Sequence, residues 1–281
     1  MKKSLSALPC FIHVEKISSI TSGLSQKCFK VYADNKVYFA KTITNKTEAQ
    51  VAVIAAKKGL SPTVFYHDKY WLITNFIDAD NLSSTTIEQA KKVSYAICLM
   101  VSCHQLNAKP AELAPKNIIA QLINKDHYST QKKAQLMHLG ESIISSLIHS
   151  KNLVCCHGDI NFSNVLIDQK QNTCLVDYEC ACIAPAEYDL AMFIAVNNLA
   201  EDKIPIIIKQ YKQQMNSVEV DIKMLYNYLA FSYFINSLWY FNVDQHESSS
   251  TLKRLQKQQW KKFICLNAST NLQHEHLAKP L

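Results

Sequence analysis

The segment CHGDINFSN, residues 156–164, carries the pattern H-G-D-x-x-x-x-N. Moving a phosphoryl group requires a carboxylate that orients the attacking hydroxyl group and accepts its proton, together with oxygen ligands that hold Mg²⁺ on the phosphates. Asp159 fits the first role. Asn164 fits the second role, because a tight loop of this length returns to the same ion. His157 is expected to give structural support to this loop.

A second motif follows in the segment LVDYE, residues 175–179. Two short β-type runs, NVLID and CLVDYE, are joined by a polar turn, so a hairpin should bring Asp177 back beside Asn164. Asp177 would then add a charged oxygen ligand of the kind that Mg²⁺ prefers. Taken alone, an aspartate here is typical of a turn at the end of a strand, and its assignment depends on the first motif.

Upstream of these motifs the chain has the pattern of a small β-rich region. Two runs rich in Val, Tyr and Phe flank Asp34-Asn35, which is typical of a hairpin turn. We expect an α+β fold, with a β-rich N-terminal lobe at 1–78 and a larger, mainly helical C-terminal lobe at 79–281. The expected strands lie at 28–33, 36–42, 63–65 and 70–77, and the expected helices at 44–58, 86–106 and 131–149.

The composition is that of an ordinary globular chain, with 48% apolar and 19% charged residues. No apolar run reaches the roughly 18 residues of a membrane span. The basic start of the chain is followed by only a short apolar stretch, so we expect no signal peptide. The ten cysteines stand in apolar contexts, as Cys98 and Cys265 do, and indicate reduced, buried side chains in a cytoplasmic protein. The spacing of the cysteines at 155, 156, 180 and 182 does not match a structural zinc site.

The net charge is +7, yet Arg254 is the only arginine among the 30 basic residues. Proteins that read DNA bases rely heavily on arginine. The charge therefore favours solvated lysines with a general attraction for anions such as ATP, and we expect no nucleic-acid partner. The sequence does not fix the oligomeric state.

Together, HGDINFSN at 157–164, LVDYE at 175–179 and YDLA at 188–191 resemble the catalytic core of the aminoglycoside phosphotransferase and choline kinase superfamily, relatives of the protein kinases. The resemblance implies a two-lobed kinase-like fold and an enzyme that uses ATP and Mg²⁺ to phosphorylate a hydroxyl group. Protein kinases have arginine at the position of Gly158, which implies that phosphorylation of an activation loop does not switch this enzyme on. Asp189 matches the aspartate that braces the catalytic loop, a structural role.

The same resemblance implies two charged partners in the N-terminal lobe. Lys41, at the end of a strand, matches the lysine that contacts the α- and β-phosphates. Glu48, at the start of the next helix, matches the glutamate that pairs with this lysine. Taken alone, both residue types are common at such positions on a protein surface.

The resemblance also places the rest of the nucleotide. The loop that covers the phosphates would be 19–27, where Gly23 is the single glycine and backbone N–H groups would make the contacts. The adenine would bind to the main chain of a hinge at 74–77, which includes Phe76 and Ile77.

The acceptor is suggested by Glu179, because the pattern D-aromatic-E is similar to choline, ethanolamine and thiamine kinases. We expect thiamine first, and choline or ethanolamine next. A pocket for a small cationic alcohol needs aromatic faces and a carboxylate, for which Tyr178, Glu179 and Trp239 are candidates. The aromatic run at 226–241 is also typical of a core helix.

Two alternatives stay open. One is an aminoglycoside or sugar phosphotransferase, although aminoglycosides need an acidic pocket and the C-terminal part is rich in lysine. The other is a pseudokinase that binds ATP without catalysis. A pseudokinase usually lacks the lysine, the base or a metal ligand, all of which are present here.

Overall fold

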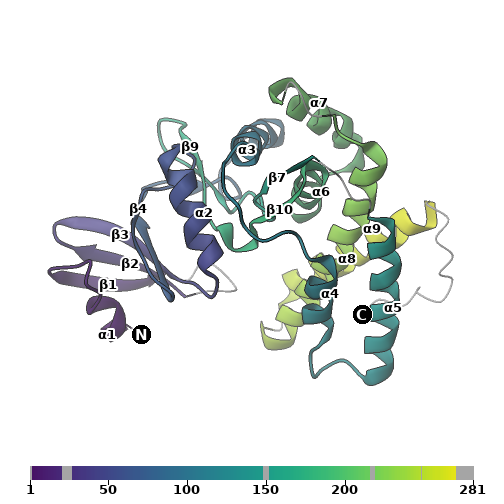
Figure 1. Ribbon diagram of the computed structural model, residues 1–281, viewed down its shortest axis with the longest axis horizontal. Coiled ribbons are helices and arrows are strands. Elements are labelled where there is room, and N and C mark those ends of the chain that lie inside the picture. The colour runs from purple at the N-terminus through teal and green to yellow at the C-terminus, as the bar shows by residue number, and fades with distance from the viewer. Residues whose placement is uncertain (1, 21–26, 148–151, 216–218, 248, 270–281) are drawn as a thin grey trace. The chain divides into compact units, whose positions relative to one another are not determined.

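The computed structural model describes residues 2–20, 27–147, 152–215, 219–247 and 249–269 (Figure 1). The α+β fold is confirmed, with a β-sheet in the N-terminal region and helices in the C-terminal region. The chain packs into two compact units, and the lobe boundary at residue 78 stays a prediction. The first unit holds residues 1–111, 154–183 and 213–215, and the second holds 112–153, 184–212 and 216–281.

The first unit begins with α1 (Lys2–Ser6) and a five-stranded antiparallel sheet of order β1-β2-β3-β5-β4. The β2–β3 hairpin turns at Asp34 and Asn35 as predicted. Their φ angles of 52° and 60° are the left-handed values that a two-residue hairpin turn requires. The strands are β1 (Val14–Ile20), β2 (Cys28–Ala33), β3 (Lys36–Thr42), β4 (Val64–His67) and β5 (Trp71–Asn75).

The two faces of this sheet have different surroundings. Along β2, Phe29, Val31 and Ala33 are buried in an apolar cluster that includes Leu5 of α1. The alternate residues of β2 are only half-buried. Because side chains alternate along a strand, these residues share the opposite face, which also carries Lys41 of β3.

Helix α2 (Lys46–Lys57) follows the sheet and has clear local signals at both ends. The side-chain oxygen of Asn45 caps it by accepting a hydrogen bond from the N–H of Thr47 at 2.9 Å. The chain leaves the helix at Gly59, whose φ of 72° suits glycine. The buried face of α2 carries Glu48, so the helix holds this carboxylate in the interior of the first unit.

The remainder of the first unit carries the two motifs. The strands β6, β8 and β9 form a second sheet, against which α3 packs, and β7 pairs with β10. The bounds are β6 (Asp80–Asn81), α3 (Gln89–His104), β7 (Leu153–Cys156), β8 (Val165–Ile167), β9 (Thr173–Leu175), the 3₁₀ turn η1 (Tyr178–Cys180) and β10 (Cys182–Pro185).

The second unit is helical and has its core along α8, which packs against α4, α5, α6 and α9. Phe231, Phe234 and Phe263 are fully buried there. Helix α4 has no counterpart among the expected helices, because its Pro115 suggests a break but occupies the first turn, where proline is tolerated. The helices are α4 (Pro115–Ile123), α5 (Thr130–Ser146), α6 (Ala186–Val196), α7 (Ile204–Gln214), α8 (Ile222–Glu247) and α9 (Ser250–Ser269), with the 3₁₀ turn η2 at Glu201–Lys203.

The cysteines correct one prediction. All ten are free thiols, but Cys98, Cys180 and Cys265 are exposed, so the prediction of burial is wrong for these three. Cys98 lies on α3 beside Ile97 in the sequence, yet it falls outside the buried stripe of the helix. Apolar neighbours in the sequence therefore do not ensure burial, because helical phase decides it. Across the described ranges, no helix is both long enough and apolar enough to cross a membrane.

Candidate active site

Asp159 stands at the centre of the catalytic loop and is held by two amide side chains. The Nδ2 of Asn161 lies 3.0 Å from both carboxylate oxygens of Asp159. The Nδ2 of Asn164 donates to Oδ2 of Asp159, and also to its backbone carbonyl, at 3.0 Å in each case. Burial raises the pKa of Asp159 to about 7, and the nearby charges of Asp177 and Glu179 act in the same direction.

The loop itself is shaped by an asparagine turn that sequence reasoning missed. The Oδ1 of Asn161 accepts hydrogen bonds from the N–H groups of Ser163 at 2.8 Å and Asn164 at 3.0 Å. Asn161 therefore both folds the loop and fixes the orientation of the Asp159 carboxylate. The signal was available in the sequence as an asparagine two residues after the aspartate, but the H-G-D-x-x-x-x-N pattern leaves this position open.

Gly158 is required by the backbone of the loop. Its φ is +78°, in the region that favours glycine. A side-chain carbon at this position would collide with the backbone carbonyl of Cys180 and would lie 3.0 Å from the Cβ of Cys180. Close approach between the catalytic loop and η1 therefore explains why this chain has glycine here.

His157 connects the loop to the strand that leads to Asp177. Its Nδ1 accepts a hydrogen bond from the N–H of Asp159 at 3.2 Å, and its Nε2 lies 3.0 Å from the carbonyl oxygen of Val176. A neutral ring with its proton on Nε2 satisfies both contacts. The ring is fully buried and packs against Tyr178, with 4.8 Å between ring centroids.

The expected hairpin brings Asp177 back to the catalytic loop. Val165 of β8 pairs with Leu175 of β9, and the N–H of Val176 donates to the carbonyl oxygen of Asn164 at 3.0 Å. Asp177 follows in a left-handed conformation, with φ 72° and ψ 65°. Such a backbone is unfavourable for most side chains and is tolerated best by glycine, asparagine and aspartate.

Lys41 joins the sheet to this hairpin. Its Nζ donates to Oε1 of Glu48 at 2.8 Å, contacts Oδ1 of Asp177, and lies 3.6 Å from Oε2 of Glu179. Burial would lower the pKa of Lys41, but the charges of Asp177 and Glu48 outweigh it and raise the pKa above the ordinary value. The ammonium group therefore stays charged although its side chain is only 7% exposed.

Carboxylates outnumber ammonium groups in this cluster, since Glu48, Asp177 and Glu179 surround Lys41. The carboxylate of Asp159 is close enough to Asp177 and Glu179 to feel their charges. An excess of carboxylate oxygen beside an asparagine amide suits a hard cation such as Mg²⁺. Asn164 and Asp177 are the residues that could hold it, because the backbone hydrogen bond between Val176 and Asn164 keeps them adjacent. The donor set thus fits the predicted metal.

The hinge offers only part of its main chain to a ligand. The N–H of Phe76 donates to the carbonyl oxygen of Val37 at 3.1 Å, so this N–H is already used. Within the described ranges, the N–H of Ile77 makes no hydrogen bond. Ile77 is therefore the residue of this pair whose N–H can serve a base.

The other predicted site residues lie elsewhere. Gly23 falls in 21–26, outside the described residues. Trp239 is 37% exposed on α8 of the second unit, where it packs edge-on against Tyr240. Tyr178 is only 2% exposed, so its ring contacts the protein interior.

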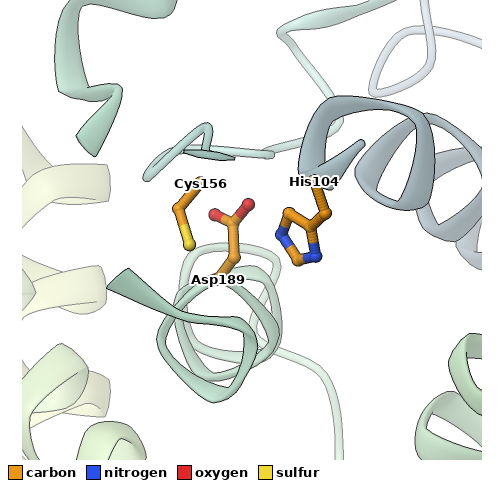
Figure 2. A group of neighbouring side chains, drawn as sticks. All are labelled: His104, Cys156 and Asp189. Atoms are coloured by element: carbon orange, nitrogen blue, oxygen red, sulfur yellow. The ribbon is translucent and has the colours of Figure 1, made fainter. Parts of the chain in front are cut away.

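Asp189 is fully buried in α6 of the second unit. Figure 2 shows its side chain together with His104, which comes from the end of α3, and Cys156, which comes from β7. His104 and Cys156 are buried residues of the first unit. None of the three is among the metal ligands predicted at Asn164 and Asp177.

Three solved structures illustrate the fold that this chain shares with known proteins. Choline kinase LicA from Streptococcus pneumoniae superposes with a TM-score of 0.71 at 18% identity, over 95% of this chain and 97% of that chain. A choline/ethanolamine kinase family protein from Mesorhizobium loti gives a TM-score of 0.69 at 16% identity, over 95% and 93%. A spectinomycin phosphotransferase gives 0.60 at 17% identity, over 95% and 92%. No curated protein sequence matches the chain.

The fold and the site define a small-molecule kinase, a phosphotransferase with a hydroxyl group as acceptor. The family model for choline/ethanolamine kinase matches residues 17–270, and the chain belongs to this family. The superfamily predicted from the three sequence motifs is therefore confirmed. The match begins before β2 and ends at the last described helix, so it includes both compact units.

Proposed function

We propose that this chain transfers the γ-phosphate of ATP to the hydroxyl group of choline or ethanolamine. The observation that carries the proposal is the gathering of Asp159, Asn164, Asp177 and Lys41 within one compact unit. The family supports the acceptor, and thiamine, the first expectation from the sequence, becomes the alternative acceptor because it is also a cationic primary alcohol.

Each residue has a role that its contacts support. Asp159 orients the acceptor hydroxyl group and takes its proton, and Asn161 keeps its carboxylate in place. Lys41, fixed by Glu48, binds the phosphates. When bound by Asn164 and Asp177, Mg²⁺ supplies the positive charge that neutralises phosphate oxygens.

Nucleotide complexes of similar structures agree with this proposal. LicA has been solved with AMP, with a TM-score of 0.72 to this chain, and the spectinomycin phosphotransferase has been solved with ADP and spectinomycin. ATP is accordingly the donor that we propose. The contact between Lys41 and Asp177 supports the proposal, because transfer of a terminal phosphate needs the ammonium group that binds the phosphates near the carboxylate that binds the metal.

The test is release of ADP from Mg-ATP with choline, ethanolamine, thiamine and spectinomycin as separate acceptors. Asp159→Asn keeps the size of the side chain and should lower kcat at least 100-fold if Asp159 is the base, on the order of what general-base catalysis contributes. Asp202→Asn is the matched control, since Asp202 is an exposed residue of the second unit and should leave kcat unchanged.

The acceptor that supports ADP release distinguishes the proposed function from its alternatives. Turnover of choline or ethanolamine that Asp159→Asn removes supports the proposal. Turnover of thiamine or spectinomycin alone keeps the kinase but replaces the acceptor. ATP binding without turnover of any acceptor favours a pseudokinase, and a chain that does not bind ATP contradicts the proposed donor.

A further inference from the structure

Lys30 lies on the same face of the sheet as the phosphate-binding lysine. In β2, Cys28 is the cross-strand partner of Lys41, and Lys30 is the partner of Phe39. Directly opposed residues of an antiparallel pair share a face, and so do residues two apart in a strand. Lys30 and Lys41 therefore both project from the face opposite the buried apolar cluster.

The ammonium group of Lys30 rests on the hinge. Its Nζ lies 3.9 Å from the ring centroid of Phe76 and 5.6 Å from that of Tyr32. Lys30 is half-buried, and it makes no hydrogen bond or ion pair with any described residue. A partly desolvated cation without a carboxylate partner leaves its N–H groups and its charge available to a ligand.

We propose that Lys30 is a further nucleotide-binding residue, which contacts the purine base of the nucleotide. This inference rests on the proposed function, which puts a nucleotide between the hinge and Lys41. A base that binds the N–H of Ile77 lies beside Phe76, whose ring already positions the Lys30 ammonium group. The face of a purine attracts a cation as an aromatic side chain does, and its ring nitrogens accept hydrogen bonds.

The decisive variant is Lys30→Met, which keeps the aliphatic stem on Phe76 and removes the charge. The probes are adenosine, which carries the base without phosphate, and tripolyphosphate, which carries the charge without the base. Isothermal titration calorimetry should show roughly three- to thirtyfold weaker binding of adenosine, in line with a cation–π contact. Binding of tripolyphosphate should be unchanged, and the KM for ATP should rise by the same factor as the adenosine Kd with kcat unchanged.

Lys16→Met is the matched control. Lys16 of β1 is the cross-strand partner of Tyr32 and so shares the same face, but its ammonium group lies against Tyr32 at 5.8 Å instead of the hinge. Its loss removes the same charge from the same face and should leave adenosine binding unchanged. Phe76→Leu removes the ring that positions Lys30 and should weaken adenosine binding in the same direction, which provides a second test if Lys30→Met folds poorly.

The outcomes separate this inference from the proposed function. Adenosine binding that is equal in the wild type and in Lys30→Met overturns the inference even if choline is phosphorylated. Equal weakening of tripolyphosphate binding in Lys30→Met and Lys16→Met also overturns it, because the effect is then one of general charge. Adenosine binding that depends on Lys30 in a chain that phosphorylates no alcohol supports the inference and contradicts the proposed function.

Discussion

The two compact units hold their important side chains by different forces. In the first unit, hydrogen bonds and an ion pair join residues far apart in the chain, as for Lys41 and Asp177, which are 136 residues apart. In the second unit, aromatic rings pack in a core, as for Phe234 and Phe263, with centroids 5.4 Å apart. A polar network demands particular residues at particular spacings, whereas an apolar core accepts many sequences of similar volume. The class of reaction can therefore be predicted from the sequence, whereas the identity of the acceptor cannot.

The largest effect on stability should come from the apolar core of the second unit. Phe263→Ala removes a fully buried ring that also packs 5.5 Å from Trp260. We expect a loss of about 3–5 kcal/mol in the free energy of unfolding, because the transfer of the ring and the cavity left behind act together. Urea denaturation followed by circular dichroism measures it.

The matched control for Phe263 is Ile206→Ala on α7. Ile206 is 52% exposed, so its truncation should change the free energy of unfolding by less than about 0.5 kcal/mol. A similar loss for both variants would show that the second unit is not held by its buried aromatic core, and the comparison between the units would fail.

The next effect should come from a glycine of the catalytic loop. Gly158→Ala places a side chain against the carbonyl of Cys180 at a positive φ, and we expect a cost of about 1–3 kcal/mol in stability. Because Asp159 must shift with the loop, kcat should fall on the order of 100-fold. Thermal denaturation and the ADP-release assay measure the two effects.

Gly59 provides the control, since its φ of +72° is similar but nothing lies within 4 Å of an added Cβ. Gly59→Ala should cost about 1 kcal/mol through the backbone alone, with kcat unchanged. If both alanine variants keep full activity, the close approach to Cys180 does not position Asp159.

A smaller loss of activity should follow from Asn161→Ala. This change removes the contacts of Nδ2 with the Asp159 carboxylate and the turn at Ser163. Hydrogen bonds to charged groups contribute about 1.5–3 kcal/mol, so we expect kcat to fall roughly tenfold or more. Ser163→Ala serves as the control, because among the described residues its exposed Oγ makes a hydrogen bond only with the Oγ of Ser83, at 3.4 Å. Equal losses for the two variants would contradict the role of Asn161 in orienting Asp159.

Local signals account for the parts of the fold that could be predicted. The Asp34-Asn35 turn, the start of α2 near Asn45 and the hairpin that returns Asp177 to Asn164 all depend on residues close in sequence. The catalytic residues could be proposed because phosphoryl transfer restricts which side chains stand at each position of a short loop.

Contacts between distant segments could not be predicted in the same way. Glu179, expected at the acceptor, lies 3.6 Å from the Nζ of Lys41, and Tyr178 is buried against His157. The N–H of Phe76 donates to the carbonyl oxygen of Val37, which belongs to β3. Such pairings follow from strand register and packing, which a single sequence does not display.

The smallest expected effect on stability concerns two cysteines of one helix, α3. Cys98 and Cys103 of α3 have similar apolar neighbours in the sequence, but Cys98 is exposed, whereas Cys103 is fully buried with its Sγ 3.5 Å from the carbonyl oxygen of Cys155. Cys98→Ser should change the free energy of unfolding by less than about 0.5 kcal/mol. Cys103→Ser should cost more, since a hydroxyl group in the interior needs a well-placed partner.

Thiol labelling of the folded chain measures the same difference without mutation. A maleimide should modify Cys98 rapidly and Cys103 only after unfolding, because access to the thiolate limits the reaction. Mass spectrometry of the peptides assigns each site. Equal rates at the two cysteines would mean that α3 opens readily in the native state, and burial of Cys103 would then not protect its thiol.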